Sequence, residues 1–144
     1  MIEYTVKVNE RGTQWFLNGK LHRADGPAVE YTDGTKKWYF NDDLHRTDGP
    51  AVESTNGTKE WYLNGQRHRT DGAAVEWPSG RKEWWLNGDL HRTDGAAVEW
   101  PNGDKEWHLN GHEVTQAAVI KPVKQLTVAK IEELLGHKIE VIAG

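Results

Sequence analysis

The chain is organised around the stretch His68-Arg69-Thr70-Asp71-Gly72, which follows Glu60-Trp61-Tyr62-Leu63-Asn64-Gly65 and precedes Ala74-Val75-Glu76-Trp77. The same phrase returns at a fixed step of 23 residues. The step is kept by Trp15, Trp38, Trp61, Trp84 and Trp107, and by His22, His45, His68 and His91. A period in this range is typical of proteins in which one small unit stacks on copies of itself. The sequence of 144 residues therefore predicts a repeat array.

Two turns divide each unit into strands. Asn64-Gly65 favours a type I′ hairpin, because both of its residues tolerate positive φ. A second turn is expected at Ser79-Gly80, between the segments Ala74-Val75-Glu76 and Lys82-Glu83-Trp84. Equivalent turns occur in the other units at Asn18-Gly19, Asn41-Asp42, Asn87-Gly88 and Asn110-Gly111, and at Asp33-Gly34, Asn56-Gly57 and Asn102-Gly103.

If both turns contain two residues, they fix the register of the sheet. The first turn then places Trp61 opposite His68, Tyr62 opposite Arg67 and Glu60 opposite Arg69. The second places Val75 opposite Trp84 and Glu76 opposite Glu83. One face would carry Val75, Trp84, Leu86 and His91, and the other would carry Glu76, Glu83, Trp85 and Arg92. A slip of one residue would exchange the two faces.

The two ends of the chain depart from the repeat. Residues 2–9 alternate between apolar and polar, which predicts a first strand paired with Gln14-Trp15-Phe16-Leu17. Between Thr127 and Gly136 an apolar stripe is formed by Val128, Ile131, Leu134 and Leu135, which predicts a helix over residues 128–135. Residues 139–142 predict a closing strand. We therefore expect an array of about five units over residues 1–119, the last one degenerate. Residues 120–144 would form a helix-plus-strand cap over the open sheet edge or one face.

The phrase Trp-Tyr-Leu-Asn-Gly-x-x-His-Arg-x-Asp-Gly-x-Ala-Val-Glu resembles the MORN repeat, and more closely its variant form in uncharacterised proteins of tailed phages and giant viruses. The match covers about residues 9–119, and residues 126–136 look like a tail found on small phage proteins. The resemblance implies an all-β, elongated, single-sheet antiparallel array of β-hairpins. It also implies a non-enzymatic platform for proteins and sometimes lipids.

Composition narrows the classes of partner. The formal net charge of −4 disfavours double-stranded nucleic acid, and the absence of a Lys/Arg cluster disfavours a lipid surface. Without cysteine, disulfides and thiolate metal sites are excluded. No apolar run approaches the roughly 18–20 residues of a membrane span, and the N-terminus lacks the pattern of a secretory signal. We therefore expect a cytoplasmic protein, in the host cell if the chain is viral.

Two constellations invite a chemical interpretation, but the repeat argues against both. Equivalent histidines lie about 9.5 Å apart, two strands at the usual spacing, so they cannot share one metal ion. We expect each histidine instead to pack on its cross-strand tryptophan and to bond an Asp-Gly turn. Facing glutamates such as Glu76 and Glu83 recur in several units, so we expect a cross-strand charge ladder with Arg69 and Arg92 rather than an acid–base pair. We expect no catalytic residue, metal or cofactor.

Two aromatic rows follow the repeat. We expect the tryptophan column to form the buried core, since large rings can fill a thin sheet. The adjoining row is Phe16, Tyr39, Tyr62, Trp85 and His108, on the opposite face. Tyr, Trp and Arg dominate binding hot spots. The residues expected to bind a partner or ligand are therefore Tyr39, Tyr62, Trp85, Arg67, Arg69, Arg92, Glu76 and Glu83. Whether the cap helix covers this row is left open.

The resemblance and the exposed row together indicate a phage-type binding protein that occupies and inhibits a host defence or regulatory protein. One alternative is a sponge that sequesters a small nucleotide-type ligand in repeated arginine and aromatic pockets. Another is a structural or assembly component of a virion. An oligomer through the sheet edge or the cap is compatible with each.

Overall fold

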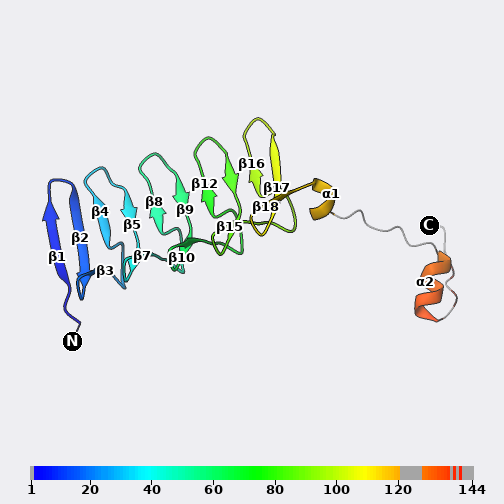
Figure 1. Cartoon of the computed structure of the whole chain (residues 1–144), viewed down its shortest axis with the longest axis horizontal. Coiled ribbons are helices and arrows are strands. Elements are labelled where there is room, and N and C mark those ends of the chain that lie inside the picture. The colour runs from blue at the N-terminus through cyan, green and yellow to red at the C-terminus, as the bar shows by residue number, and fades with distance from the viewer. Residues whose placement is uncertain (1, 121–127, 137, 139, 141–144) are drawn as a thin grey trace.

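The computed structural model describes residues 2–120, 128–136, 138 and 140. Long hairpins stand side by side in one antiparallel sheet of 12 strands, in the order β1-β2-β4-β5-β8-β9-β12-β13-β16-β17-β18 with β3 beside β2 (Figure 1). The long hairpins are β1 (Thr5–Asn9) with β2 (Gly12–Leu17), β4 (Val29–Tyr31) with β5 (Lys36–Lys37), β8 (Val52–Glu53) with β9 (Lys59–Glu60), β12 (Val75–Glu76) with β13 (Lys82–Glu83), and β16 (Val98–Glu99) with β17 (Lys105–Leu109). The predicted all-β hairpin array is confirmed.

A second set of short strands lies at the lower end of the long hairpins in Figure 1. In the middle units the chain leaves the large sheet at the repeated tryptophan, and the next residues form a separate two-stranded hairpin. These hairpins are β6 (Tyr39–Phe40) with β7 (Asp43–Leu44), β10 (Tyr62–Leu63) with β11 (Gln66–Arg67), and β14 (Trp85–Leu86) with β15 (Asp89–Leu90). In the outer units β3 (Lys20–Leu21) pairs with β2, and β18 (His112–Val114) pairs with β17.

The turns of the short hairpins match their predicted type. Asn64 and Gly65 both have positive φ, at 49° and 77°, as a type I′ turn requires. The pairing of Tyr62 with Arg67 is as predicted. The N–H of His68 donates to the carbonyl of Trp61 over 3.1 Å, so these two residues also lie opposite each other.

The predicted register of the long hairpins is wrong by one residue. Val75 pairs with Glu83, and Glu76 pairs with Lys82. The cause is a three-residue loop: the N–H of Gly80 donates to Trp77 O, the N–H of Trp77 donates to Arg81 O, and Gly80 has a φ of 93°. This is a type I turn followed by a glycine bulge, which adds one residue to the loop. The equivalent glycines, Gly34, Gly57 and Gly103, have φ of 94°, 90° and 93°.

The extra residue exchanges the faces of the sheet. Directly opposite residues share a face, so Val75, Glu83 and Trp85 lie on one side, while Glu76, Trp84 and Arg92 lie on the other. We call these the valine face and the arginine face. The predicted facing pairs Glu76–Glu83, Glu53–Glu60 and Glu99–Glu106 do not form. The arginine face instead carries a ladder of alternating charge: Glu30, Lys36, Glu53, Lys59, Glu76, Lys82, Glu99 and Lys105.

The buried core consists of small side chains. It contains Ala28, Val29, Ala51, Val52, Ala74, Val75, Ala97 and Val98, with Ala73 and Ala96 beside them. The five repeated tryptophans keep equivalent positions but are only half-buried, so the prediction of a buried indole core is wrong. A single-layer sheet has no second layer to cover rings of this size. The backbone N–H of each of the first four tryptophans donates to the carbonyl of a core alanine (Ala28, Ala51, Ala74 or Ala97), as between Trp61 and Ala74 at 2.8 Å.

Backbone and histidine contacts join successive units. His68 Nδ1 accepts a hydrogen bond over 3.1 Å from the N–H of Asn87, which lies in the Asn-Gly turn of the next unit. The predicted hydrogen bond from this histidine to an Asp-Gly turn is therefore wrong. The N–H of Gly88 donates to Arg67 O over 2.9 Å, and the N–H of Arg69 donates to Trp85 O over 3.1 Å. Each short hairpin is thereby attached to the one that follows it in the chain.

The C-terminal part contains two short helices, α1 (Gln116–Val119) and α2 (Val128–Leu135). The predicted bounds of α2 are confirmed, and Gly136, at a φ of 70°, donates its N–H to Glu132 O. None of the residues of α2 is buried, and the covering role of this helix stays a prediction. Thr127 and the predicted strand at 139–142 fall outside the described residues, except for Glu140. Neither helix of the described part is long and apolar enough to span a bilayer.

Amide exchange tests the links between units. The turn amides of Gly65, Gly88 and Gly111 each donate to the preceding unit. Gly19 lies in the first unit, and its amide has no backbone acceptor among the described residues. We expect Gly19 to exchange at least about tenfold faster than the other three, because hydrogen-bonded amides exchange only on local opening. Equal rates in hydrogen–deuterium exchange NMR would contradict the links.

Candidate binding surfaces

A single arginine closes each unit on the arginine face. Arg69 Nε donates to Asp71 Oδ1 over 2.9 Å, and its Nη1 donates to Ala73 O over 2.9 Å and to Glu76 Oε1 over 3.1 Å. Its guanidinium lies 3.9 Å from the ring centre of Trp61. Cation–π and charge-assisted contacts of this kind are among the stronger polar interactions in proteins. Arg69 therefore ties together an indole, a turn and the next strand.

The arrangement repeats with little change. The equivalent arginines lie 3.8–4.0 Å from their indoles, in the pairs Arg23–Trp15, Arg46–Trp38 and Arg92–Trp84. The glycine of the repeated Asp-Gly provides the space: a Cβ on Gly72 would lie 2.9 Å from Arg69 Cζ. This glycine does not need positive φ, because its role is to let the guanidinium pack against the backbone.

In the described part of the chain, three equivalent clefts lie between successive Arg-x-Asp-Gly loops, where x is Ala24 in the first unit and threonine in the others. The largest, of about 620 Å³, has walls from loops 69–72 and 91–94 and a floor that includes Trp84 and Leu86. The other two measure about 580 and 410 Å³. The recurrence of the cleft fits a protein that binds several copies of a nucleotide. The charge of the clefts does not fit a phosphate group, because each arginine is already paired with carboxylates. Hydrogen bonding from Arg69, and its charge, hold the pKa of Asp71 below its ordinary value, so the cleft also presents a persistent anion.

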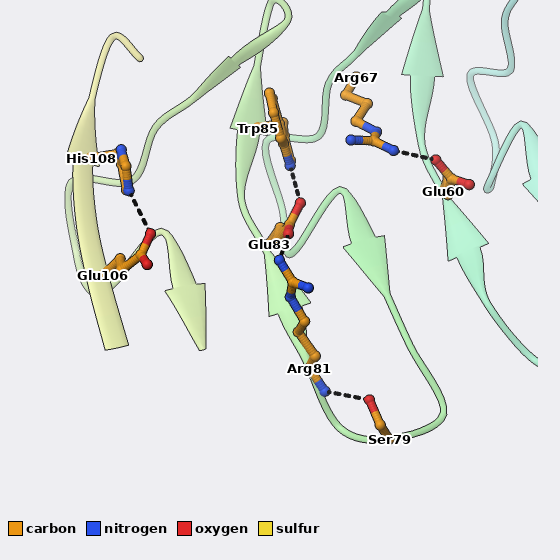
Figure 2. A network of polar contacts seen from close by, with 8 residues as sticks. All are labelled: Glu60, Arg67, Ser79, Arg81, Glu83, Trp85, Glu106 and His108. Atoms are coloured by element: carbon orange, nitrogen blue, oxygen red, sulfur yellow. Dashed lines mark hydrogen bonds and ion pairs between the residues drawn. The ribbon is translucent and has the colours of Figure 1, made fainter. Parts of the chain in front are cut away.

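The valine face of the central units carries a different network. Glu60 Oε2 accepts hydrogen bonds from Tyr62 Oη over 3.0 Å and from Arg67 Nη2 over 3.0 Å, and Arg67 Nε donates to Tyr62 Oη over 3.2 Å. Figure 2 shows Arg67 pointing toward Glu60. The pKa of Tyr62 is raised, first by burial and then by Glu60, so its hydroxyl keeps its proton as a donor.

Glu83 forms the next part of the same network. Its side chain is 8% exposed and accepts hydrogen bonds from Arg81 Nη2 and from Trp85 Nε1, the latter over 2.8 Å. Both carboxylate oxygens are therefore used, which offsets the cost of burying the charge. Figure 2 shows Arg81 and Trp85 approaching Glu83 from opposite sides.

The arginines of this network also contact aromatic rings. Arg81 lies 4.8 Å from the ring of Trp77 and 5.2 Å from that of Trp100. Arg67 lies 5.2 Å from the ring of Trp85 and 5.9 Å from that of Tyr62. All these side chains are half-buried. We call them the aromatic–arginine patch: Tyr62, Arg67, Trp77, Arg81, Trp85 and Trp100.

Three residues of the patch depart from the repeat. Arg67 stands where other units have Leu21, Leu44 and Leu90, and Arg81 where they have Thr35, Thr58 and Asp104. Trp77 stands where earlier units have Tyr31 and Ser54, and the next unit repeats it as Trp100. The backbone pairing of these units is unchanged by the substitutions. The strand pairing therefore does not depend on these residues.

The structure separates the predicted binding residues into two groups. Tyr62, Arg67, Glu83 and Trp85 come together in the patch or directly beneath it. Tyr39 shares their face, as the alternation of the strand requires, but belongs to an earlier unit. Arg69, Arg92 and Glu76 lie on the arginine face, where each arginine closes its own unit. The sequence prediction missed Trp77, Arg81 and Trp100, which a position-by-position comparison of the units could have found.

No arrangement for metal binding is present in the described part of the chain, where no three His, Asp or Glu side chains are placed to hold one ion. The glutamates predicted to face each other, Glu76 and Glu83, lie on opposite faces. His68 and Asp71 use Nδ1 and Oδ1 for bonds within the scaffold.

Comparisons of the chain with protein-family models, curated proteins and solved structures give no match. The resemblance to the MORN repeat is neither supported nor contradicted by them.

Removing the central arginine of a unit tests its structural role. We expect Arg69→Met to lower the free energy of unfolding by about 2 kcal/mol, because it removes hydrogen bonds to charged groups that are partly buried. The matched control is Arg11→Met, at an exposed turn residue. Urea denaturation followed by circular dichroism measures both, and equal effects of the two substitutions would contradict the assigned role.

Acidification tests the Asp–Arg contacts. The pKa values of Asp48 and Asp71 are lowered in the folded chain, chiefly by hydrogen bonds from Arg46 and Arg69. A lowered folded pKa gives stability that is present above the unfolded pKa and is lost as the pH falls through the folded one, here below about pH 4. We expect the double variant Asp48→Asn, Asp71→Asn to be less stable than the parent at pH values above this window. The two stability curves should converge toward about pH 2, and curves that stay parallel would refute the contacts.

Proposed function

We propose that the chain is a non-enzymatic binding protein that docks a protein partner on the aromatic–arginine patch. The observation that supports this best is a comparison of the units of this chain: most positions recur from unit to unit, but a few positions in the central units carry different residues. The repeated residues are used within and between units, while Arg67, Arg81 and Trp77 replace repeat residues without changing the strand pairing. Residues on which the strand pairing does not depend are free to serve a partner.

The chemistry of the patch supports a protein rather than a charged small ligand. Its two arginines are paired with Glu60 and Glu83, so the patch has no net charge to attract phosphate. Its rings and guanidinium groups are of the types enriched in hot spots. The hydrogen bonds fix their positions before a partner arrives, which reduces the side-chain entropy lost on binding.

The resemblance to repeat proteins of tailed phages supports a more specific proposal. The partner would be a host defence or regulatory protein in the cytoplasm, and binding would inhibit it by covering its working surface. This part rests on the resemblance alone, whereas the location of the docking surface rests on the contacts of the patch.

The proposal is tested by reverting the patch to the residues of the other units. Arg67→Leu, and separately Trp77→Ser, introduce side chains found at these positions in other units, and both leave the buried Glu83 paired with Arg81. The matched control is Thr70→Ala with Thr93→Ala, two exposed residues of the arginine face. Proteins captured from host lysate by the parent are identified by mass spectrometry, purified and titrated against each variant.

We expect each patch variant to weaken binding at least about tenfold, which corresponds to 1.4 kcal/mol, and the control to bind like the parent. Loss of binding in the control with full binding by the patch variants would move the site to the clefts. Saturable heat from a nucleotide panel in calorimetry would favour the small-ligand alternative instead.

A further inference from the structure

The first strand leaves one edge of the large sheet open. β1 comes first in the strand order and pairs only with β2. All five of its residues are exposed, and Val6 and Val8 are 47% and 74% exposed. Edge strands with exposed apolar side chains readily pair with another strand.

The direction of the backbone groups on this edge follows from the neighbouring strand. The N–H of Trp15 in β2 donates to Ala28 O on the far side, so the backbone of Trp15 points away from β1. Val6 lies opposite Trp15. In an antiparallel ladder such a position is the one without hydrogen bonds between the two strands. The N–H and C=O of Val6 therefore point outward, and by the same alternation so do those of Tyr4 and Val8.

This pattern is self-complementary. A second β1 running antiparallel can place Val6 opposite its own copy and Tyr4 opposite Val8, and each of these pairs then exchanges both N–H···O bonds. Apolar side chains meet on one face, and Lys7 stands opposite Thr5 on the other. The alternative register centred on Lys7 would place two lysines opposite each other, which is unfavourable.

We propose that two copies of the chain associate through their β1 strands, about a two-fold axis through Val6, into one continuous antiparallel sheet. A second copy is the occupant because the strand's own sequence satisfies the outward bonds and the apolar side chains, and in this register the two Lys7 side chains do not face each other. The axis is perpendicular to the sheet, so both aromatic–arginine patches lie on the same side of the dimer. The proposal does not depend on what the patch binds.

The mass of the full-length chain in solution, measured by sedimentation equilibrium over a range of concentrations, gives the first test. We expect a dimer whose dissociation constant rises at least tenfold in Val6→Pro, since proline removes the outward N–H but no bond to β2. The sequence has no cysteine, so single cysteines report the register directly. Opposite residues have Cα atoms about 5.5 Å apart, within disulfide range.

Oxidation is expected to crosslink Val6→Cys into a covalent dimer and to leave Lys7→Cys largely monomeric, because Lys7 and its copy are offset along the strands. These variants keep the backbone of β1 intact, so the test holds even if Val6→Pro fails to fold. A chain that stays monomeric at millimolar concentration, with or without a foreign peptide bound at β1, would overturn the proposal. Preferential crosslinking of Lys7→Cys would overturn it as well.

Discussion

The stacking of Arg69 on Trp61, closed by Asp71 and Glu76, is the contact on which the array depends. A single-layer sheet buries little apolar surface, and its core here is made of alanine and valine. The large rings lie outside that core, where an arginine covers each of the first four. The repeated Arg, Asp, Gly and Glu of each unit are explained by this one arrangement.

The histidine of the repeat has a separate role. His45, His68 and His91 accept the asparagine N–H of the following unit, so the type I′ turn is fixed both by its own φ angles and by its neighbour. Within-unit arginine contacts and between-unit histidine contacts together make each unit dependent on the next, as expected of stacked repeats. In the fifth unit Val114 stands opposite Trp107 where earlier units have histidine, and the array ends.

Much of the fold could be predicted from the sequence, because period and turn chemistry are local. The Asn64-Gly65 hairpin, the β1–β2 pairing and the bounds of α2 follow from such signals. The side chains on each face of the sheet could not be predicted, since they depend on whether the turn at Pro78-Ser79-Gly80 contains two or three loop residues. A shift of the pairing by one residue moves every side chain of the strand to the other face. For the same reason the predicted cross-strand partner of Glu83 is wrong. The predicted pairing of Tyr62 with Arg67 is confirmed, because the two-residue turn Asn64-Gly65 fixes it. The roles of Trp77 and Arg81 could not be predicted from the period, because the residue type at their positions changes from unit to unit.

A double-mutant cycle between Arg69 and Trp61 tests the central contact most directly. Unfolding free energies of Arg69→Met, Trp61→Leu and the double variant are compared with that of the parent. If the stacked pair stabilises the unit, the cycle gives a coupling of about 1 kcal/mol, typical of a partly desolvated cation–π contact. A coupling below about 0.3 kcal/mol, the usual level for independent sites, would contradict this account of how the array is held together.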